Sequence, residues 1–356
     1  MKLLFLIHNM SHRAGTERVL SSIANELAGR NYDITIASCR DGRNSGFKLD
    51  KRINLVSLEG EKYGNPVVRR LKGIGKIRKL NKKNEYDYII CIDVSLVFYA
   101  MFAKYKNTKI IAWEHFNYGV NTGSKLQSYA RHISCKNADI LVVLTDRDKE
   151  LYEKNEKDIK KIVRIYNPIT TDNREWDIQR DKTVLAVGRL ENQKGFDLLL
   201  DGWKNIEDKY SDWKLRIAGV GSKEAQLKQQ MSDLQLKNVQ FAGYIDDINE
   251  EFRKASVFVC SSRFEGFGMV ILEAQANELP VVSFDCPYGP SELIKDGYTG
   301  ILVENGDVPA LSAGIEKLIN DKDLRSRLAI EAKKWSESFN VTGICDRWEK
   351  LLKQGI

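Results

Sequence analysis

Two basic residues lie on one glycine-flanked segment in the second half of the chain. Arg189 and Lys194 stand between Gly188 and Gly195, after a short apolar run and before a segment of helical periodicity. Arginine offers phosphate oxygens a planar fork of donors, and lysine offers a point charge. On a strand-to-helix loop, the pair predicts a phosphate site. The alternative is two solvated loop cations.

Two glutamates follow within the stretch Ser261–Ala274. We expect Glu265 on a glycine-bearing turn, and Glu273 about one and a half turns into a helix that begins near Gly268. At ~1.5 Å rise per residue, the carboxylates would stand on the order of 10 Å apart. This is wider than the ~5 Å pair of a retaining glycosidase and suits two carboxylates that hold different hydroxyl groups of one ligand. The alternative for Glu273 is an ordinary helix-surface carboxylate.

A third segment, Gly219-Val220-Gly221, ends an apolar run before another helical pattern. Glycines at such a place let the backbone approach a ligand, and the helix N-terminus that follows favours anions. A plain tight turn explains the pattern equally well. The third glycine of a dinucleotide-binding fingerprint is missing.

The elements that must position these residues alternate along the chain. Short β-branched runs are separated by longer helical patterns, which predicts parallel strands with helical crossovers. The predicted strands are Leu3–Ile7, Asp33–Ala37, Tyr86–Ile92, Lys109–Trp113, Ile140–Leu144, Ile162–Tyr166, Thr183–Val187, Lys214–Ala218, Val257–Cys260, Pro280–Phe284 and Ile301–Val303.

The alternation pauses at Tyr166-Asn167-Pro168-Ile169, where an Asn-Pro pair marks a turn. We therefore predict an α/β fold with two Rossmann-like, doubly wound parallel-sheet domains, at residues 1–167 and 168–340, and an amphipathic terminal helix at 341–356. Ligands bind at the carboxyl ends of such strands, so we expect the site in a cleft that both domains face.

Taken together and in this order, Gly188-Arg189-Leu190 with Lys194-Gly195, Gly219-x-Gly221 and Glu265-x7-Glu273 resemble the retaining family 4 glycosyltransferases of the GT-B fold. The resemblance covers most of the chain. Ala14-Gly15-Thr16-Glu17-Arg18 is similar to the family's Gly-Gly-x-Glu-Arg entry to the first helix, with alanine in place of the first glycine. The terminal segment resembles the helix that crosses back to the first domain in this family.

The resemblance implies that residues 1–167 bind the acceptor and residues 168–340 bind the nucleotide-sugar, and it implies roles for the matching positions. Arg189 and Lys194 would neutralise the donor diphosphate and the charge that develops as it leaves. Glu273 would bind the ribose hydroxyls, and Glu265 would contact the donor sugar. The backbone beside sugar, phosphate and base would come from Gly15, Gly188, Gly219, Tyr244, Ile245, Phe267, Gly268 and Met269.

His115 follows a predicted strand of the first domain, next to Glu114. The resemblance matches it to the family histidine near the donor sugar, where it would orient the sugar or stabilise positive charge at the anomeric carbon. A histidine is more often structural. The family's same-face mechanism implies that the leaving phosphate helps to deprotonate the acceptor, so no separate base is required. We expect no cofactor and no metal, since no Asp-x-Asp triplet ends a strand.

Residues 62–84 contain nine basic side chains and no acidic one, with apolar residues at helical spacing. The cations that we single out are Arg69, Arg70, Lys72, Lys76, Arg78 and Lys79. The segment predicts a basic amphipathic helix, although Gly73 and Gly75 weaken the helical pattern. Its charged face suits anionic lipid headgroups or the diphosphate of a lipid-linked acceptor, or it is simply solvated. We expect no nucleic acid partner, because no nucleic-acid-binding motif accompanies the charge.

The composition is typical of a globular protein, and the distribution of its charge indicates an anionic partner. The 356 residues carry a net charge of +7, but residues 1–167 hold 31 basic and 18 acidic side chains, whereas residues 168–356 hold 25 and 31. Six scattered cysteines indicate reduced thiols, and the apolar run Met1–Ile7 is too short for a secretory signal. No run reaches the ~18–20 apolar residues of a membrane span. These features predict a cytoplasmic protein, peripheral on the inner face of the cell membrane.

The leading hypothesis is a retaining glycosyltransferase that moves a sugar from a nucleotide donor, with UDP favoured, to a glycan or lipid-linked oligosaccharide. Hexosyl and N-acetylhexosaminyl donors both fit. One alternative is a nucleotide-sugar 2-epimerase of the same fold. Another is a basic membrane- or nucleic-acid-binding module without catalysis, which leaves the Arg189, Lys194, Glu265 and Glu273 set unexplained.

Overall fold

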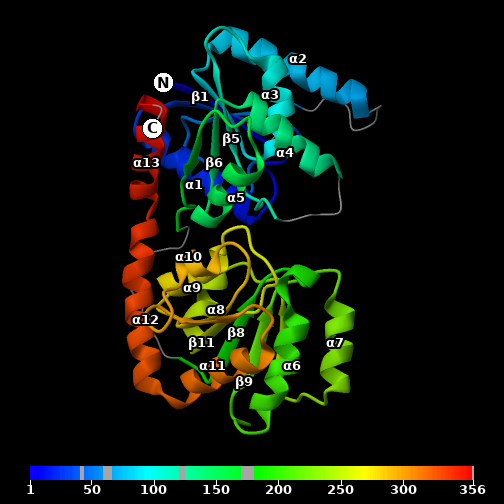
Figure 1. Ribbon diagram of the computed structural model, residues 1–356, viewed down its shortest axis with the longest axis vertical. Coiled ribbons are helices and arrows are strands. Elements are labelled where there is room, and N and C mark those ends of the chain that lie inside the picture. The colour runs from blue at the N-terminus through cyan, green and yellow to red at the C-terminus, as the bar shows by residue number, and fades with distance from the viewer. Residues whose placement is uncertain (41–43, 59–65, 120–124, 170–179, 355–356) are drawn as a thin grey trace. The chain divides into compact units, whose positions relative to one another are not determined.

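The computed structural model describes residues 1–40, 44–58, 66–119, 125–169 and 180–354. The chain forms two compact units (Figure 1). Unit 1 comprises Met1–Thr170 and Val341–Ile356, and unit 2 comprises Thr171–Asn340.

Unit 1 is built on a parallel sheet of seven strands in the order β3-β2-β1-β4-β5-β6-β7. Its strands are β1 (Lys2–Ile7), β2 (Asp33–Ser38), β3 (Asn54–Ser57), β4 (Tyr88–Cys91), β5 (Lys109–Trp113), β6 (Ile140–Val143) and β7 (Ile162–Arg164). In the central strand β1, Leu3 and Phe5 alternate with Leu4 and Leu6, and all four side chains are fully buried. Because successive side chains of a strand point to opposite faces, both faces of this sheet are covered.

Four helices of unit 1 contribute to the core on one face of its sheet. They are α2 (Pro66–Asn84), α3 (Val97–Ala103), α4 (Lys125–Asn137) and α5 (Asp146–Asn155). Each adds a buried side chain to the cluster that holds Leu4 and Leu6, namely Ile77, Ala100, Cys135 and Tyr152. A 3-10 turn, η1 (Val94–Leu96), leads from β4 into α3.

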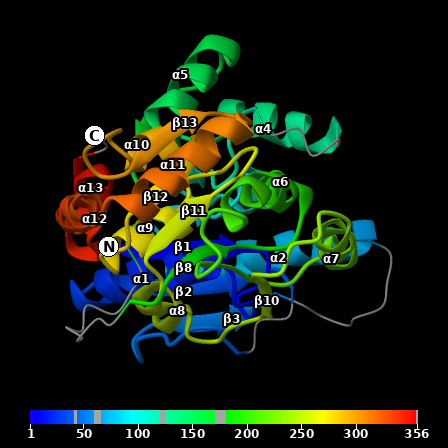
Figure 2. The ribbon, with the colours of Figure 1, turned by 90° about the horizontal axis from the view of Figure 1, so that it is seen from below.

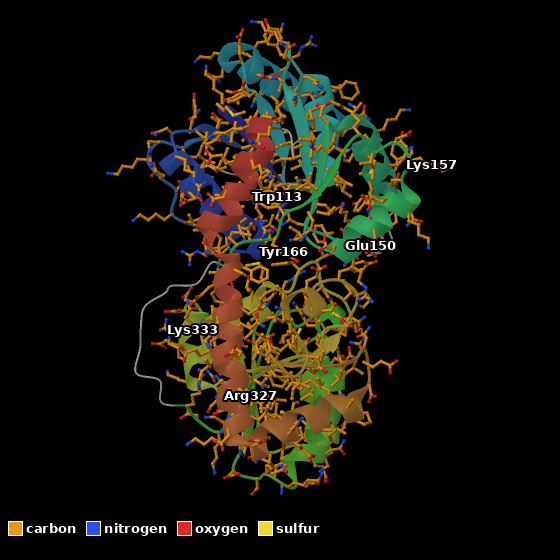
Figure 3. The ribbon with its side chains drawn as sticks, turned by 60° about the vertical axis from the view of Figure 1, so that its left-hand side comes forward. Trp113, Glu150, Lys157, Tyr166, Arg327 and Lys333 are labelled. Carbon is orange, nitrogen blue, oxygen red and sulfur yellow. The ribbon has the colours of Figure 1, made fainter. Side chains whose placement is uncertain are left out.

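The terminal helix α13 (Val341–Gln354) belongs to unit 1 and packs against α1 (Gly15–Gly29). Arg30, which caps α1, forms an ion pair of 2.6 Å with Asp346. On the buried side of α13, the ring of Trp348 lies 4.8 Å from that of Trp113, centroid to centroid. Figure 3 labels Trp113 beside this helix. This helix therefore supports the end of β5 from a distant part of the sequence.

Unit 2 repeats the architecture with six parallel strands in the order β10-β9-β8-β11-β12-β13. Its strands are β8 (Thr183–Val187), β9 (Lys214–Ala218), β10 (Val239–Gly243), β11 (Val257–Cys260), β12 (Val281–Asp285) and β13 (Ile301–Glu304). Strands β8, β11, β12 and β13 follow one another in Figure 2. The helices are α6 (Phe196–Glu207), α7 (Glu224–Asp233), α8 (Ile248–Lys254), α9 (Met269–Ala276), α10 (Pro290–Leu293), α11 (Val308–Asn320) and α12 (Lys322–Ser336). Two 3-10 turns, η2 (Asn192–Lys194) and η3 (Glu337–Phe339), complete the unit.

The predicted fold class is confirmed, since both sheets are parallel and wound with helices. Two strands, β3 and β10, were not predicted from the sequence. Both lie at sheet edges, are partly exposed and lack the buried apolar runs of the central strands. The predicted basic helix is confirmed, because α2 continues through Gly73 and Gly75. A Cβ at Gly73 would lie 3.5 Å from the ring of Tyr99, an ordinary van der Waals distance, so the packing of α2 on α3 does not require glycine at this position.

Among the helices of the described ranges, none has both the length and the apolar character of a membrane span.

Candidate functional site

The loop after β8 is fixed by a glycine. Gly195 is the N-cap residue of α6 and has a φ of 62°, in the left-handed region. A Cβ at this position would lie 2.1 Å from the carbonyl oxygen of Ser261, on the loop after β11. Both the dihedral angle and the close approach require glycine. The residue therefore lets two strand-end loops meet.

The meeting of these loops brings together two of the predicted site residues. Lys194 Nζ lies 2.7 Å from Glu265 Oε1, and the side chains are 15% and 7% exposed. Ser262 Oγ donates a second hydrogen bond, of 2.6 Å, to the same oxygen. Burial alone would lower the pKa of Lys194, but the Glu265 carboxylate outweighs it and raises the pKa above the usual value. Lys194 is therefore a cation held in a fixed position.

Side chains from one loop hold the backbone of the other. Ser261 Oγ donates to the carbonyl of Lys194 over 2.9 Å. Arg263 Nη1 donates to the carbonyl of Asn192 over 2.9 Å, and its guanidinium forms two bonds, of 2.6 and 2.7 Å, to the Asp197 carboxylate in the first turn of α6. These residues were not singled out from the sequence. For Arg263 and Asp197, the only signal was their opposite charge, Arg263 lying inside Ser261–Ala274 and Asp197 two residues after Gly195.

The second predicted cation, Arg189, has a different environment. Its side chain is exposed, and no ion pair of the described residues holds its guanidinium. Gly188 lies beneath the Lys194 side chain, whose Cε would be 2.9 Å from a Cβ at that position. Gly188 therefore leaves room for Lys194, while Arg189 extends from the same loop into solvent.

The glycines after β9 have a packing role. Gly219 has a φ of 140°, and a Cβ there would lie 1.9 Å from the carbonyl oxygen of Gly188. Its N–H donates to the carbonyl of Gly243 at the end of β10 over 2.8 Å. The ends of three neighbouring strands thus come together at backbone level. Tyr244 follows as a 60% exposed side chain, and Ile245 is half-buried.

Helix α9 begins at a third glycine site. Its N-cap, Gly268, has a φ of 90°, Met269 is its first residue, and the neighbouring Phe267 is buried. Glu273 is also buried, so the alternative of an ordinary helix-surface carboxylate is wrong. A buried carboxylate is unfavourable unless hydrogen bonds or an opposite charge compensate it. The burial of Glu273 therefore implies polar partners for its carboxylate.

In unit 1, Gly15 is the first residue of α1. A Cβ there would have no atom within 4 Å, so packing does not require a glycine at this position. Two residues on, Glu17 is buried, and its Oε2 has no hydrogen-bond partner among the described residues. Burial raises the pKa of Glu17, against the hydrogen bonds of the backbone at Glu17 and Ala14 and the charges of His12 and His8.

His115 follows β5 and is partly buried. Its ring centroid lies 4.6 Å from that of Trp113, and its Nε2 is buried without a hydrogen-bond partner in the described part of the chain. Burial lowers the pKa of His115 to about 4, although the negative charge of Asp93 opposes the shift. The imidazole is therefore neutral near pH 7.

The loop that carries His115 is tied down by buried carboxyl groups. Glu114 Oε1 accepts the N–H of Phe116 over 2.8 Å, and Tyr152 Oη donates to Glu114 Oε2 over 2.9 Å. Asp148 Oδ1 accepts the N–H of Tyr118 over 2.6 Å. Burial is the main cause that raises the pKa of Glu114 to about 8 and that of Asp148 to about 6.

Arg131 completes this network from α4. It is buried, donates to the carbonyl of Asn117 over 3.2 Å and lies over the ring of Tyr118 at 4.9 Å. Three side chains in or beside α4 and α5 thus hold the loop, namely Arg131, Asp148 and Tyr152. No short-range pattern in the sequence indicates them, because each meets the loop only in the folded unit.

The basic helix α2 lies in unit 1 as well. Its exposed cations include Arg70, Lys72, Arg78 and Lys79, and Lys76 donates to the carbonyl of Leu58 over 2.9 Å. The side chain of Arg69 lies outside the described residues. Leu71 is 64% exposed on the same helix, so α2 presents apolar as well as basic side chains to solvent.

The predicted site residues thus form two groups, one in each unit. Unit 2 holds Arg189, Lys194, Glu265, Glu273 and the glycine-lined strand ends, and unit 1 holds Gly15, His115 and the basic helix. Within the described ranges, no cluster of three or more His, Cys, Asp or Glu side chains could hold a metal ion.

Two family models match the chain. Residues 13–173 match the family model described as Glycosyltransferase Family 4, and residues 169–335 match that of Glycosyl transferases group 1. An uncharacterized glycosyltransferase of Haemophilus influenzae is 30% identical over 356 residues, with 99% of each chain covered.

A Campylobacter jejuni enzyme is 28% identical over 365 residues, with 99% of each chain covered. Its name is GalNAc-alpha-(1->4)-GalNAc-alpha-(1->3)-diNAcBac-PP-undecaprenol alpha-1,4-N-acetyl-D-galactosaminyltransferase. The structure of a TarM variant of S. aureus, in complex with fondaparinux, alpha-GlcNAc-glycerol and UDP, superposes with a TM-score of 0.83. It shares 16% sequence identity and covers 99% of this chain and 100% of its own. The chain belongs to the family 4 glycosyltransferases and has their GT-B fold.

Proposed function

We propose that this glycosyltransferase transfers a sugar from a UDP-sugar to a glycan or lipid-linked oligosaccharide with retention of the anomeric configuration. The observation that carries the proposal is the Lys194–Glu265 pair, a fixed cation and a carboxylate at strand ends lined with glycines. A relative whose name describes an undecaprenol-linked acceptor and a fold neighbour in complex with UDP support the choice of acceptor and nucleotide.

In this proposal, unit 2 binds the donor. Arg189 and Lys194 bind the diphosphate together with the N-terminus of α9 at Gly268, because cations and helix N-termini both stabilise phosphate oxygens. Glu273 binds the ribose hydroxyls and Glu265 binds the donor sugar. The backbone of Gly188, Gly219, Phe267 and Met269 lies along the donor, with Tyr244 and Ile245 at the base, and Gly15 contributes backbone contacts to the phosphates.

The proposed chemistry depends on charge and position. As the sugar–phosphate bond breaks, negative charge grows on the diphosphate. Lys194, which is already held in place, stabilises this charge without reorganisation, and Arg189 adds a second cation from the same loop. The acceptor hydroxyl attacks the same face of the sugar and passes its proton to the leaving phosphate. His115, neutral near pH 7, orients the sugar by a hydrogen bond or through its backbone. No metal ion or other cofactor takes part.

Two substitutions test the donor site with different expected results. Lys194→Met removes the fixed cation, so we expect kcat to fall about 10²–10³-fold and UDP to bind at least 10-fold more weakly. Glu265→Gln removes the carboxylate that pairs with Lys194 but keeps an oxygen that can accept its hydrogen bond, so transfer should be lost with a smaller loss of UDP binding than in Lys194→Met. Lys214→Met changes an exposed lysine at the start of β9 and is the matched control.

The assay measures UDP release from a panel of UDP-sugars, UDP binding by calorimetry and the anomeric configuration of the product by NMR. GDP- and ADP-sugars in the same panel test which nucleotide base the enzyme prefers. Full activity in Lys194→Met or Glu265→Gln would overturn the site assignment, and a product of inverted configuration would overturn retention.

The surface of α2 supports peripheral binding to the inner face of the cell membrane. Arg70, Lys72, Arg78 and Lys79 are exposed, and the neighbouring helix α3 adds the exposed rings of Phe98 and Phe102. Each cation near an anionic surface contributes about 1 kcal/mol, so four should strengthen binding by roughly three orders of magnitude at low salt.

Vesicle flotation tests this association. We compare neutral phosphatidylcholine vesicles with vesicles that contain phosphatidylglycerol, and we replace the four α2 cations by glutamine. The control variant replaces four lysines of unit 2 instead: Lys204, Lys214, Lys228 and Lys254. Binding that is equal in both variants, or that does not depend on salt, would contradict the proposal.

A further inference from the structure

The backbone of the 3-10 turn η2 is held by the loop after β11, and the last residue of this turn is Lys194. All three carbonyls of the turn accept hydrogen bonds from that loop. Arg263 Nη1 donates to the carbonyl of Asn192 over 2.9 Å, and the N–H of Arg263 donates to the carbonyl of Gln193 over 2.8 Å. The third carbonyl, that of Lys194, accepts from Ser261 Oγ. Two of the three bonds therefore come from one residue, Arg263.

The guanidinium of Arg263 also reaches the helix that follows the turn. Its Nη1 and Nη2 lie 2.7 and 2.6 Å from the two carboxylate oxygens of Asp197, in the first turn of α6. Between the turn and this helix stands the left-handed Gly195, where a Cβ would lie 3.6 Å from Arg263 Nη1. The guanidinium therefore joins η2 to α6 across the residue at which the chain changes direction.

The pair of Arg263 and Asp197 is better suited to fixing a position than to raising stability. Hydrogen bonds between the two groups are the main cause that lowers the pKa of Asp197 and raises that of Arg263, so both are charged near pH 7. Their side chains are 30% and 38% exposed, and water screens the attraction between charges that are exposed to this extent. Two parallel bonds between planar groups nevertheless define one relative orientation, which a lysine could not impose.

Lys194 depends on such a support because its ammonium group ends a flexible four-carbon chain. The chain lies over Gly188, and Nζ meets Glu265 Oε1 at 2.7 Å. Both contacts require the backbone of η2 to stay in place. A displacement of about 1 Å at a group that takes part in a reaction can reduce the rate roughly 10²-fold.

We infer that Arg263 is a positioning residue for Lys194. It holds the backbone of η2 against α6, and its contribution to the rate passes through the position of the Lys194 ammonium. The inference rests on the proposed function, in which Lys194 stabilises the charge of the leaving diphosphate. It adds to that function a residue that acts on the reaction through another side chain.

Three substitutions in the full-length protein test this role. Arg263→Met removes the guanidinium, Arg263→Lys keeps the charge without the planar fork, and Asp197→Asn weakens the pair from the other side. The matched control is Arg216→Met, which removes a guanidinium with two bonds to Glu251 in the same unit. The assay measures kcat for UDP release from UDP-glucose, UDP-galactose and their N-acetylated counterparts, the Kd for UDP, and the Tm.

A double-mutant cycle with Lys194→Met separates positioning from a general loss of stability. We expect Arg263→Met to lower kcat about 10–10²-fold in the wild-type background, but less than 2-fold in the Lys194→Met background, because the cation that Arg263 positions is then absent. Arg263→Lys should recover part of the rate, and Asp197→Asn should lose part of it. Arg216→Met should lower the Tm as Arg263→Met does, but change kcat less than 2-fold. In Arg263→Met, UDP binding should weaken less than in Lys194→Met.

Three results would overturn the inference. They are a kcat of Arg263→Met within 2-fold of the wild type, an equally large effect of Arg263→Met in both backgrounds, and an equal loss of kcat in Arg216→Met. Failure of the proposed function gives a different result, because the wild type would then not bind UDP, or Lys194→Met would keep the full kcat.

Discussion

Replacing Glu114 by glutamine tests whether a buried neutral carboxyl group holds the loop that carries His115. Burial raises the pKa of Glu114 to about 8, and the negative charges of Asp93 and Asp148 add to this effect. The hydrogen bond from Phe116 and the charge of Arg131 act in the opposite direction. Glutamine resembles the protonated carboxyl in shape and in its hydrogen bonds, but it cannot ionise.

The magnitude follows from the difference between the folded and unfolded pKa values. From the usual value of 4.5 to about 8 the shift is about 3.5 units, which corresponds to about 5 kcal/mol. Between these two values the unfolded chain has released the proton that the folded chain still binds. The free energy of unfolding is therefore at its full value below pH 4.5 and falls as the pH rises to about 8, after which this loss is complete.

Calorimetric unfolding of wild type and Glu114→Gln from pH 5 to pH 9 measures this loss. A unit of this size shifts its Tm by about 2–4 °C per kcal/mol. We therefore expect the two proteins to unfold at similar temperatures at pH 5, and Glu114→Gln to exceed the wild type by at least about 5 °C at pH 9. The control Asp33→Asn should show no such trend. A difference that is flat with pH, or that falls, would refute the buried neutral carboxyl.

Four further substitutions have expected outcomes. Arg180→Met removes a guanidinium that donates to five backbone carbonyls at the ends of α8 and α9, so we expect a loss of about 3 kcal/mol or more in urea unfolding. Trp348→Ala empties the contact between α13 and β5, so calorimetry should show a loss of about 3–5 kcal/mol. Gly219→Ala would place a Cβ 1.9 Å from a carbonyl oxygen, and calorimetry should show that UDP binding is abolished. Gly306→Ala, at a φ of 83° in open space, should bind UDP normally and lose only about 1 kcal/mol of stability.

The central strands could be predicted because burial on both faces leaves a mark in the sequence. Strands such as β1 and β11 are continuous apolar runs, and their parallel pairing follows from the helices between them. The edge strands β3 and β10 are partly exposed and form hydrogen bonds on one side only, so their composition resembles that of a loop. Backbone pairing, which sequence patterns do not report, makes them strands.

The site could be predicted only as far as residue type fixes chemistry. Lys194 and Glu265 were singled out, but their 2.7 Å ion pair joins positions 71 residues apart and depends on the left-handed Gly195 that lets the loops meet. His115 was singled out as well, but not the Tyr152 hydroxyl that bonds its neighbour from α5. Such partners are ordinary residues of helices, and only tertiary packing brings them to the loop.

The two units hold their candidate loops by the same physical means. In unit 1 the backbone around Phe116 is bonded by Glu114, and in unit 2 the carbonyl of Lys194 is bonded by Ser261. A transferase of the proposed kind gains its rate from donors and charges that already stand where charge develops, so freedom in these loops would reduce it directly. Side chains that bond loop backbone supply this rigidity without occupying the surface that substrates contact. A substitution of Ser261 therefore affects catalysis by displacing Lys194. We expect such a substitution to change kcat and to leave UDP binding nearly unchanged.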